Sequence, residues 1–331
     1  MSTYAFKYTG KNCGGSRKNE AGDYSSRRLA YSGAYSFRKN AGLKLIEYFQ
    51  NKHLSDEYIV AKLSEYWKED MPNGDQTTEC TVPENTHIKA EIQAVEELVF
   101  AGKKIIPHCF GKDCQVTKSQ EDGSLLSSGD LLAMVTGSAR DILSRERVML
   151  NLIQRLCGIA TLSRKYAKIA NPFNVMILDT RKTTPGLRLF EKYAVAIGGS
   201  YNHRLNLSDG ILIKDNHIIA AGSITRAIES VQKSNTNLPL ELEVDNINQI
   251  KEALKIGVDG FLLDNMDVNT IRLAVSIIRE SENGDDIFIE ASGGINIENI
   301  HPYLDTGINA ISIGALTHRA ISKDIRLEFI I

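Results

Sequence analysis

The sequence predicts an α/β protein, in which an N-terminal α+β domain precedes an incomplete β/α barrel of about seven parallel strands. Short apolar runs alternate with helical segments throughout the second half of the chain, a pattern that indicates a parallel sheet. That half contains no glycine fingerprint for dinucleotide binding, which favours a barrel over an open sheet. The 331 residues are 42% hydrophobic and 24% charged, which is usual for a globular protein of about two domains.

The first forty residues differ from the rest of the chain. Residues 1–40 contain eight Lys or Arg against only Glu20 and Asp23, and they show no sustained apolar period. We therefore predict a basic, flexible extension that is solvated and has no partner. Nucleic-acid contact or an organelle address is the alternative. Because the net charge of the whole chain is −2, we expect no nucleic-acid partner.

Residues 41–148 predict the α+β domain, and residues 319–331 are expected to join it. Apolar residues at helical spacing predict a helix over 41–68. Alternating apolar and polar residues predict strands over 88–95 and within 131–142. The first half of the predicted helix depends on the spacing of Leu43, Ile46 and Phe49.

Residues 149–318 predict the barrel, and a long helix over 145–170 leads into it. A second helix is expected to have Thr184 as its cap and Pro185 at its first position. Gly198 suits its end. The parallel strands are expected near residues 175–180, 200–203, 210–213, 240–245, 260–264, 287–291 and 310–314.

The cysteines indicate a reducing compartment. They are odd in number and scattered, so we predict a cytoplasmic protein without a disulfide framework. No apolar run reaches the length of a membrane span and no signal-peptide core is present, so no membrane partner is expected. The five are Cys13, Cys80, Cys109, Cys114 and Cys157.

Basic side chains follow three of the predicted strands. Arg181 and Lys182 follow the first, His203 and Arg204 follow the second, and Lys214 follows the third. Cations are unfavourable near a packed sheet, and the carboxyl ends of barrel strands meet at one mouth. The sequence therefore predicts a site for a ligand that carries several negative charges.

The later strands end in carboxylates and glycines. Glu243 lies between Glu241 and Asp245 on one predicted face, and Asp264 ends the next strand. Carboxylates that face a barrel interior need cations, a metal ion or ligand hydroxyls to remain charged. Gly-rich turns then close the last two strands, at the position where barrels commonly bind a phosphate.

Other polar residues have a simpler structural interpretation. Arg188 and Lys192 lie inside the second predicted helix, and we expect them to be solvated helix charges. His108, Cys109 and Cys114 lack convincing metal-ligand spacing, so no metal site is predicted there.

Long motifs in a fixed order carry a family resemblance. They are Glu146-Arg147 with Asn151, Asp179 to Arg188, Asn202-His203-Arg204, Leu212 to His217, Glu241 to Asp245, Leu262 to Met266, Glu290 to Ile295, and Gly314 to His318. Together they resemble quinolinate phosphoribosyltransferase, the decarboxylating nicotinate-nucleotide pyrophosphorylase family of NAD biosynthesis. The resemblance runs from about Leu63 to the C-terminus and leaves the first forty residues without a counterpart.

The resemblance implies a reaction and a set of site residues. Family members join quinolinate to phosphoribosyl pyrophosphate, require Mg²⁺, and release pyrophosphate and carbon dioxide to give nicotinate mononucleotide. Lys182, Glu243 and Asp264 are the implied catalytic residues. Lys182 is expected to face the pyrophosphate, and the two carboxylates are expected to bind the ribose hydroxyls and, through substrate or water, the Mg²⁺. The implied quinolinate ligands are Arg147, Arg181, His203, Arg204 and Lys214. The implied 5′-phosphate ligands are Ser292, Gly293, Gly294, Gly314 and His318.

The resemblance also implies an assembly. In the family, the arginine corresponding to Arg147 enters the active site of the neighbouring subunit, so a homodimer or a higher even oligomer is expected. One departure is Asn206, where the family commonly has glycine after the His-Arg pair.

Three rival functions remain at this point. A family relative of the kind found in molybdenum-transport operons shares the fold but uses another acid. A Schiff-base aldolase would use Lys182 or Lys214 and would be trapped by borohydride with a carbonyl substrate. A non-catalytic protein that binds nucleotides or nucleic acid would depend on residues 1–40, whose removal leaves a transferase active.

Overall fold

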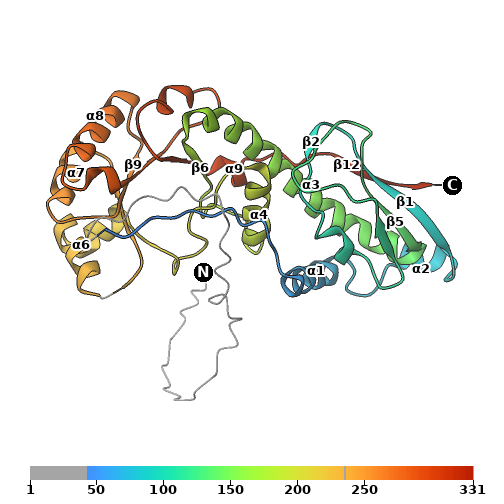
Figure 1. Cartoon of the computed structure of the whole chain (residues 1–331). Coiled ribbons are helices and arrows are strands. Elements are labelled where there is room, and N and C mark those ends of the chain that lie inside the picture. The colour runs from blue at the N-terminus through green and yellow to red at the C-terminus, as the bar shows by residue number, and fades with distance from the viewer. Residues whose placement is uncertain (1–42, 235, 331) are drawn as a thin grey trace, which may run out of the picture. The chain divides into compact units, whose positions relative to one another are not determined.

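The computed structural model describes residues 43–234 and 236–330, drawn as the coloured ribbon in Figure 1. The predicted basic extension, residues 1–40, lies outside the described residues. No helix in the described part of the chain is both long and apolar enough to cross a membrane.

The first half of the described chain, together with its last strand, builds a four-stranded antiparallel sheet with the order β12-β1-β5-β3. Its central strands, β1 (His87–Ala94) and β5 (Leu131–Ser138), lie close to the predicted strands. The last strand, β12 (Ile325–Ile330), pairs antiparallel with β1. The other elements of this region are α1 (Asp56–Asp70), α2 (Gln76–Thr81), β2 (Leu98–Val99), the short helix η1 (Ile106–Cys109), β3 (Gln115–Thr117) and β4 (Leu125–Leu126).

Residues 43–51, which we call the strap, are extended. The helix predicted over 41–68 is therefore wrong in its first half, and α1 begins only after the strap. Ile46 is buried whereas Phe49 is 66% exposed, so the apolar spacing that suggested a helix does not mark one face. The strap instead pairs through its backbone, where Phe49 forms an antiparallel bridge with Asn202.

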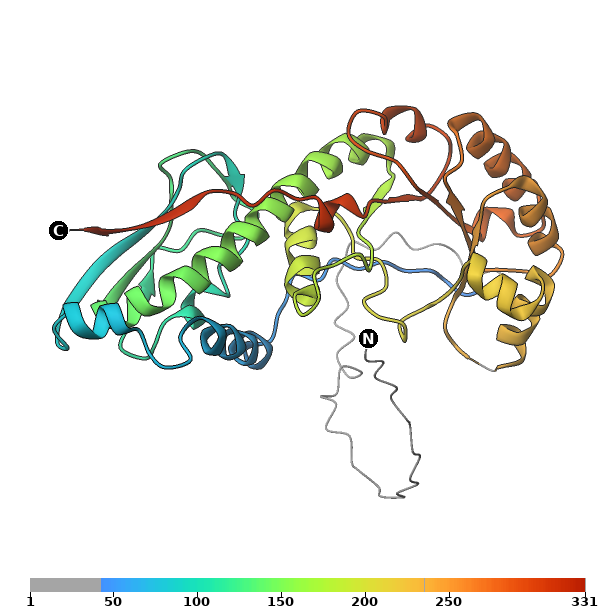
Figure 2. The same ribbon diagram turned by 180° about the vertical axis from the view of Figure 1, so that it is seen from behind.

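The long helix α3 (Ala139–Ala170) connects the two sheets, as both ribbon views show in green (Figures 1 and 2). It begins six residues before the predicted start. Its first half is tied to the antiparallel region, where the Ser144 hydroxyl donates to Asp75 at 3.0 Å. Its second half is tied to the parallel region, where Arg164 Nε donates to the carbonyl of Gly198 at 2.8 Å.

The second half of the chain builds a parallel sheet with the order β6-β11-β10-β9-β8-β7. The strands are β6 (Met176–Leu178), β7 (Ile211–Ile213), β8 (Leu240–Val244), β9 (Gly260–Asp264), β10 (Phe288–Ser292) and β11 (Ala310–Ser312). Six of the seven predicted strands are present among the described residues. The remaining predicted strand, near 200–203, joins the parallel sheet only through a parallel bridge between Tyr201 and Leu178. The next backbone N–H groups donate elsewhere, that of Asn202 to the strap and that of His203 to the side chain of Asp179.

Helices follow the strands, and Figure 1 shows α6, α7 and α8 in a row along one side of the sheet. The helix predicted to begin at Pro185 begins at Arg188 instead. Thr184 does not cap it, since its backbone N–H and its hydroxyl both donate to the side chain of Glu191. The end at Gly198 is confirmed. The helices are α4 (Arg188–Gly198), α5 (Asp215–Ala221), α6 (Ile224–Lys233), α7 (Ile247–Leu254), α8 (Val268–Arg279) and α9 (Ala315–His318), with the short helices η2 (Asn171–Phe173), η3 (Gly284–Asp286) and η4 (His301–Tyr303).

The two faces of the parallel sheet bury different clusters. Alternate residues of a strand point to opposite faces. Ile289 and Ile311 lie on the face that packs against the helices in the main apolar core. The other face, represented by Phe288 and Ala310, forms a second cluster whose remaining buried members include Ile46 of the strap. The strap therefore covers the inner face of the sheet.

Candidate active site

The basic loop that follows β6 is held in place by polar groups. The carboxylate of Glu191, which is fully buried, accepts from Thr184 N at 3.0 Å and from Thr184 Oγ1 at 2.8 Å. Arg155 of α3 donates to the same carboxylate at 3.0 Å. The hydroxyl of Thr317 donates to the carbonyl oxygen of Lys182 at 2.7 Å. The loop that carries Lys182 is thus fixed from α3, α4 and α9.

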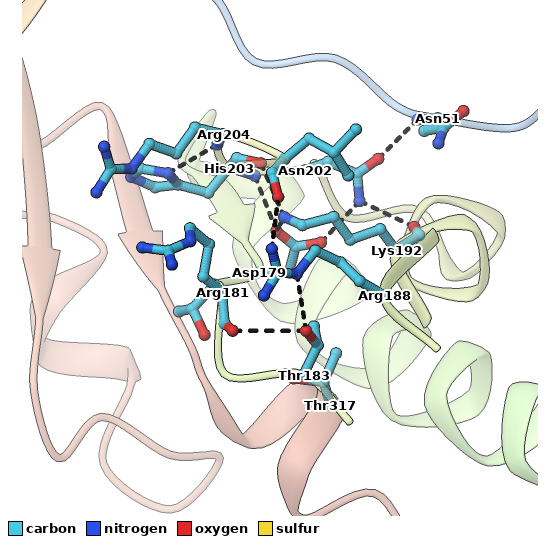
Figure 3. A network of polar contacts seen from close by, with 12 residues as sticks. Asn51, Asp179, Arg181, Thr183, Arg188, Lys192, Asn202, His203, Arg204 and Thr317 are labelled. Carbon is cyan, nitrogen blue, oxygen red and sulfur yellow. Dashed lines mark hydrogen bonds and ion pairs between the residues drawn. The ribbon is translucent and has the colours of Figure 1, made fainter. Parts of the chain in front are cut away.

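Two guanidinium groups lie close together beyond the strand ends. Figure 3 shows the side chains of Arg181 and Arg204 on the same side of the polar network. Burial, and next the positive charge of Arg181, lower the pKa of Arg204. In the described part of the chain no carboxylate forms an ion pair with either group, and Arg181 Nε is buried without a hydrogen-bond partner. The charges of Glu241 and Asp209 partly oppose the lowering of the Arg204 pKa. Two like charges that form no ion pair are the arrangement expected of a site that binds an anionic ligand.

A buried ion pair holds the backbone of His203, the residue before Arg204. Asp179 and Lys192 are both wholly buried and bonded to each other (Figure 3). Asp179 also accepts from Asn202 Nδ2 at 2.8 Å and from His203 N at 2.9 Å, and Lys192 donates to the carbonyl of His203 at 2.8 Å. Burial raises the pKa of Asp179 and lowers that of Lys192, while each partner opposes the other's shift. The prediction that Lys192 is solvated is therefore wrong.

His203 lies in a buried cluster on the inner face of the sheet. Its Nδ1 accepts from the backbone N–H of Arg204 at 2.8 Å. Its Nε2 lies 3.2 Å from the hydroxyl of Tyr48 and 3.6 Å from carboxylate oxygens of Glu241 and Glu290. Burial lowers the pKa of His203, but Glu290 and Glu241 outweigh it, so the net shift is upward. Because Nδ1 accepts, Nε2 carries the proton.

The two carboxylates of this cluster share a low-dielectric environment. Burial, followed by the charge of Glu241, raises the pKa of Glu290 to about 7. The Tyr48 hydroxyl lies 3.3 Å from Glu241 Oε2 and 3.4 Å from Glu290 Oε2, so it can donate to either. One ligand atom each of His203, Glu241 and Glu290 lies within 4.8 Å of the others, a grouping that would suit a metal ion. The Tyr48 hydroxyl can reach only Oε2 of each carboxylate, and Oε1 of Glu241 and of Glu290 is buried without a hydrogen-bond partner.

The raised pKa of Glu290 predicts a pH-dependent stability. The folded protein holds a proton that the unfolded chain releases near pH 4.5, so its stabilising effect is complete below that pH and is lost as pH rises through about 7. Relative to Glu290→Gln, we expect wild-type stability to fall by up to about 3 kcal/mol between pH 5 and pH 8. Urea unfolding at four pH values measures this. Glu298→Gln, which changes an exposed side chain, serves as the control, and a Glu290→Gln profile parallel to wild type contradicts the prediction.

The predicted acidic residues lie on neighbouring strands. Glu243 of β8 is opposite Leu262 of β9, so Asp264, two residues further along, lies on the same face. Glu243 forms an ion pair with Lys214, and Asp264 accepts from its neighbour Asn265 at 2.6 Å. Both carboxylates are half-buried at carboxyl ends of strands. Carboxylate oxygens with access to water are the donors that Mg²⁺ prefers, so these two residues fit a magnesium site.

The loops that follow β9 and β10 interlock. Asn265 N donates to the carbonyl of Ser292 at 2.9 Å. Gly293 has φ +93° and faces the side chain of Asn265 so closely that any Cβ would collide with it. Gly294 follows with φ +65° and is exposed. Glycine is therefore required at 293 by both backbone conformation and space, and the turn presents bare backbone at the strand ends.

Lys182, Gly314 and His318 come together although they lie in different segments. A Cβ on Gly314 would stand 3.1 Å from Lys182 Cδ and 3.1 Å from His318 Cε1. The two side chains therefore flank the backbone of Gly314, at the start of α9. This is one basic corner of the site, separate from the pair formed by Arg181 and Arg204.

Arg147 is the predicted ligand that no described contact ties to the others. It is exposed in the first third of α3, close along the helix to Ser144, which contacts the antiparallel region. No hydrogen bond or ion pair of its side chain occurs among the described residues. Its role across a subunit interface stays a prediction.

Three residues that hold the site escaped the sequence analysis. The sequence places Tyr48 within the helix predicted over 41–68, predicts that Lys192 is solvated, and assigns no role to Glu191. For Tyr48, an available signal was that Ile46 and Tyr48 are two residues apart, a spacing that places them on one face of an extended segment. For Lys192, the signal was its position within a largely apolar helix that contains Ala194, Val195 and Ala196.

Two protein-family models match the chain. The model described as quinolinate phosphoribosyl transferase, C-terminal domain, matches residues 159–328. The model described as quinolinate phosphoribosyl transferase, N-terminal domain, matches residues 75–157. The strap lies outside both matched ranges.

Curated relatives and solved structures agree with these models. The chain is 41% identical over 270 residues to the probable nicotinate-nucleotide pyrophosphorylase (carboxylating) of Bacillus subtilis, covering 80% of this chain and 91% of the relative. It is 40% identical over 266 residues to the nicotinate-nucleotide pyrophosphorylase (carboxylating) of Mycobacterium leprae, covering 78% and 93%. The solved nicotinate-nucleotide pyrophosphorylase of Francisella tularensis superposes with a TM-score of 0.79 at 33% identity, covering 85% of this chain and 99% of that one.

Proposed function

The chain belongs to the quinolinate phosphoribosyl transferase family, and we propose that its basic strand ends bind quinolinate beside phosphoribosyl pyrophosphate. It is a phosphoribosyltransferase of NAD biosynthesis that forms nicotinate mononucleotide, pyrophosphate and carbon dioxide. The word carboxylating in the relatives' names describes the same reaction in reverse. The observation that carries the proposal is the pair of guanidinium groups, Arg181 and Arg204, which forms no ion pair among the described residues.

The acid site is proposed at this pair. Quinolinate is a dianion with two neighbouring carboxylates, and guanidinium groups bind carboxylates through two parallel N–H bonds. Arg181 and Arg204 would hold the carboxylates, with Lys214 at the end of the next strand. Arg204 is already fixed by the bond from its Nη1 to the carbonyl of Gly210 at 2.8 Å. His203 lies behind them with both ring nitrogens facing protein groups.

The phosphoribosyl site is proposed at the glycine turns. Lys182 and His318, which flank Gly314, would neutralise the pyrophosphate and the 5′-phosphate. Ser292, Gly293 and Gly294 would contribute a hydroxyl and backbone N–H groups to the 5′-phosphate, as strand-end glycines do in phosphate-binding barrels. The parallel sheet would then act as the wall of an incomplete barrel, with both substrates at its carboxyl ends.

Catalysis is proposed to rest on orientation and charge. The ring nitrogen of quinolinate forms a bond to the anomeric carbon as the bond to pyrophosphate breaks, and positive charge develops on the ribose. Glu243 and Asp264 lie where their carboxylates would stabilise that charge, and Lys182 would stabilise the leaving pyrophosphate. The adjacent carboxylate then leaves as carbon dioxide. Its electron pair stays on the ring carbon, which the positively charged ring nitrogen stabilises, and that carbon takes up a proton.

Mg²⁺ is proposed at Glu243 and Asp264, where it would neutralise the pyrophosphate oxygens. We expect chelation by EDTA to abolish turnover. Glu243→Gln should raise the Mg²⁺ concentration for half-maximal activity by about tenfold or more, because a carboxylate that holds the ion through substrate or water loses its charge. Asp245→Asn is the matched control, since Asp245 is an exposed carboxylate one step beyond β8. An unchanged Mg²⁺ dependence in Glu243→Gln excludes Glu243 from the metal site.

A cytoplasmic location is proposed from the cysteine pattern.

A dimer is proposed as the working unit, with Arg147 supplied to the neighbouring subunit. Arg147 supports this assembly because it is exposed and unpaired among the described residues. Mixing an Arg147→Ala subunit with a subunit inactivated at Lys182 should restore activity in the heterodimer, where one site is intact. No restoration contradicts a shared site.

The decisive assay combines the purified protein with Mg²⁺, quinolinate and phosphoribosyl pyrophosphate. Nicotinate mononucleotide and carbon dioxide are expected in equal amounts. Nicotinate, which lacks one carboxylate, should be a poor substrate. Absence of product from folded protein rejects the proposed function, and a preference for another acid would identify a relative with the same fold and a different substrate.

A further inference from the structure

We infer that the strap is a built-in support for the acid site, and that Tyr48 is a positioning residue for the His203–Arg204 pair. The inference rests on the proposed function, because its first test measures the KM for quinolinate. It goes beyond the family match, because residues 43–51 precede residue 75, where that match begins.

The strap holds the backbone of the acid site at two points. The backbone N–H of Asn202 donates to the carbonyl of Phe49 at 2.9 Å, and the backbone N–H of Asn51 donates to Asn202 Oδ1 at 2.7 Å. On the opposite side, Tyr201 is bridged to β6. The strap and β6 therefore hold residues 201–202 from two sides. These contacts take the place of the strand predicted over 200–203.

The strap also enters the inner face of the sheet. Ile46 occupies the space that Gly260 leaves free, since a Cβ on Gly260 would stand 2.5 Å from Ile46 Cδ1. Two residues later Tyr48 points the same way, with its ring 5.4 Å from that of Phe288 in an edge-on contact and 4.8 Å from that of His203. Ile46 and Tyr48 are two residues apart and point the same way, which an extended chain allows and a helix does not.

The Tyr48 hydroxyl completes a directed chain of hydrogen bonds. The N–H of Arg204 donates to His203 Nδ1, so His203 Nε2 carries a proton that it can donate to Tyr48 Oη at 3.2 Å. Tyr48 in turn donates to a carboxylate, either Glu241 at 3.3 Å or Glu290 at 3.4 Å. Both ring nitrogens of His203 thus have a defined role, which orients the imidazole plane. Because the other edge of that ring binds the backbone of Arg204, the strap sets where the Arg204 side chain begins.

Without the hydroxyl, the ring of His203 has direct carboxylate partners only at 3.6 Å. It must move toward them to form a hydrogen bond of normal length, away from Arg204 N. Small displacements of a binding group weaken the binding of the ligand that it orients. The expected effect falls on the acid and spares the phosphoribosyl substrate, whose proposed ligands lie on other strand ends.

The test compares Tyr48→Phe with Tyr303→Phe. Both remove one hydroxyl, and Tyr303 lies in η4, outside the cluster. In Tyr48→Phe we expect the KM for quinolinate to rise about tenfold, the size expected for losing a buried hydrogen bond, while kcat and the KM for phosphoribosyl pyrophosphate change less than about twofold. Tyr303→Phe should match wild type in all three constants.

A second readout is independent of turnover. In protein labelled with ¹⁵N-histidine, the Nε2 resonance of His203, assigned by its disappearance in His203→Gln, should shift in Tyr48→Phe and stay in place in Tyr303→Phe. If the wild type makes product and Tyr48→Phe keeps the wild-type KM for quinolinate, the positioning role is overturned. If the wild type makes no product, the proposed function fails, and an unmoved His203 resonance would then overturn the contact by itself.

Discussion

Replacing Lys182 by alanine is expected to lower kcat by about 10²–10³-fold, the largest single loss of activity that the site predicts. Its side chain lies against Gly314 beside His318, where the proposed pyrophosphate leaves with additional negative charge. The backbone of Lys182 is held by Thr317 and does not depend on the side chain, so the fold should be unaffected. Steady-state kinetics with both substrates varied would measure this.

Lys182→Arg separates electrostatic stabilisation from covalent chemistry. An arginine keeps the positive charge and should recover part of the lost rate, whereas an aldolase that forms a Schiff base at this lysine would stay inactive. Lys233→Ala, which removes an exposed lysine on α6, is the matched control and should be as active as wild type. A near-normal rate in Lys182→Ala would remove this residue from the site.

Lys192→Met is expected to produce the largest loss of stability, about 3–5 kcal/mol, with a fall in melting temperature on the order of 10 °C. The substitution leaves Asp179 buried and charged without its cation. It also frees the carbonyl of His203, so the acid site should loosen and the KM for quinolinate should rise. Thermal unfolding and kinetics on the same preparation measure both effects.

The double variant Asp179→Leu with Lys192→Met distinguishes burial of charge from positioning. Removing both charges should recover much of the stability, because a buried ion pair is often replaceable by apolar side chains. The high KM should remain, because Asn202 and His203 have then lost the acceptor for their N–H groups. A melting temperature of Lys192→Met equal to that of wild type would show that the buried pair is not a main source of stability.

The sequence predicted six of the parallel strands and the polar residues that follow them. Loops that follow parallel strands of one sheet share an edge, so basic, acidic and glycine residues at strand ends could be grouped without knowing which strands are neighbours. The meeting of Lys182 with Gly314 and His318 follows from that rule, because β6 pairs directly with β11.

What sequence reasoning missed depends on partners that are distant in the chain. Lys192 looks like an ordinary helix charge until the fold places Asp179 against it. Tyr48 meets Glu290, 242 residues further along, and no local pattern encodes that distance. The spacing of Leu43, Ile46 and Phe49 is that of a helix, and only the distant bridge between Phe49 and Asn202 reveals that the segment is not helical.

The pairing of β12 with β1 has a consequence for how the protein is made. This ladder joins Lys89 to Ile330, so the antiparallel sheet gains its edge strand only after residue 330 has been synthesised. The parallel sheet also gains β11 late in synthesis, so both sheets depend on residues 310–330. Contacts that span so much chain are slow to form. Until β12 pairs with it, β1 presents an open edge to which a strand of another chain could add.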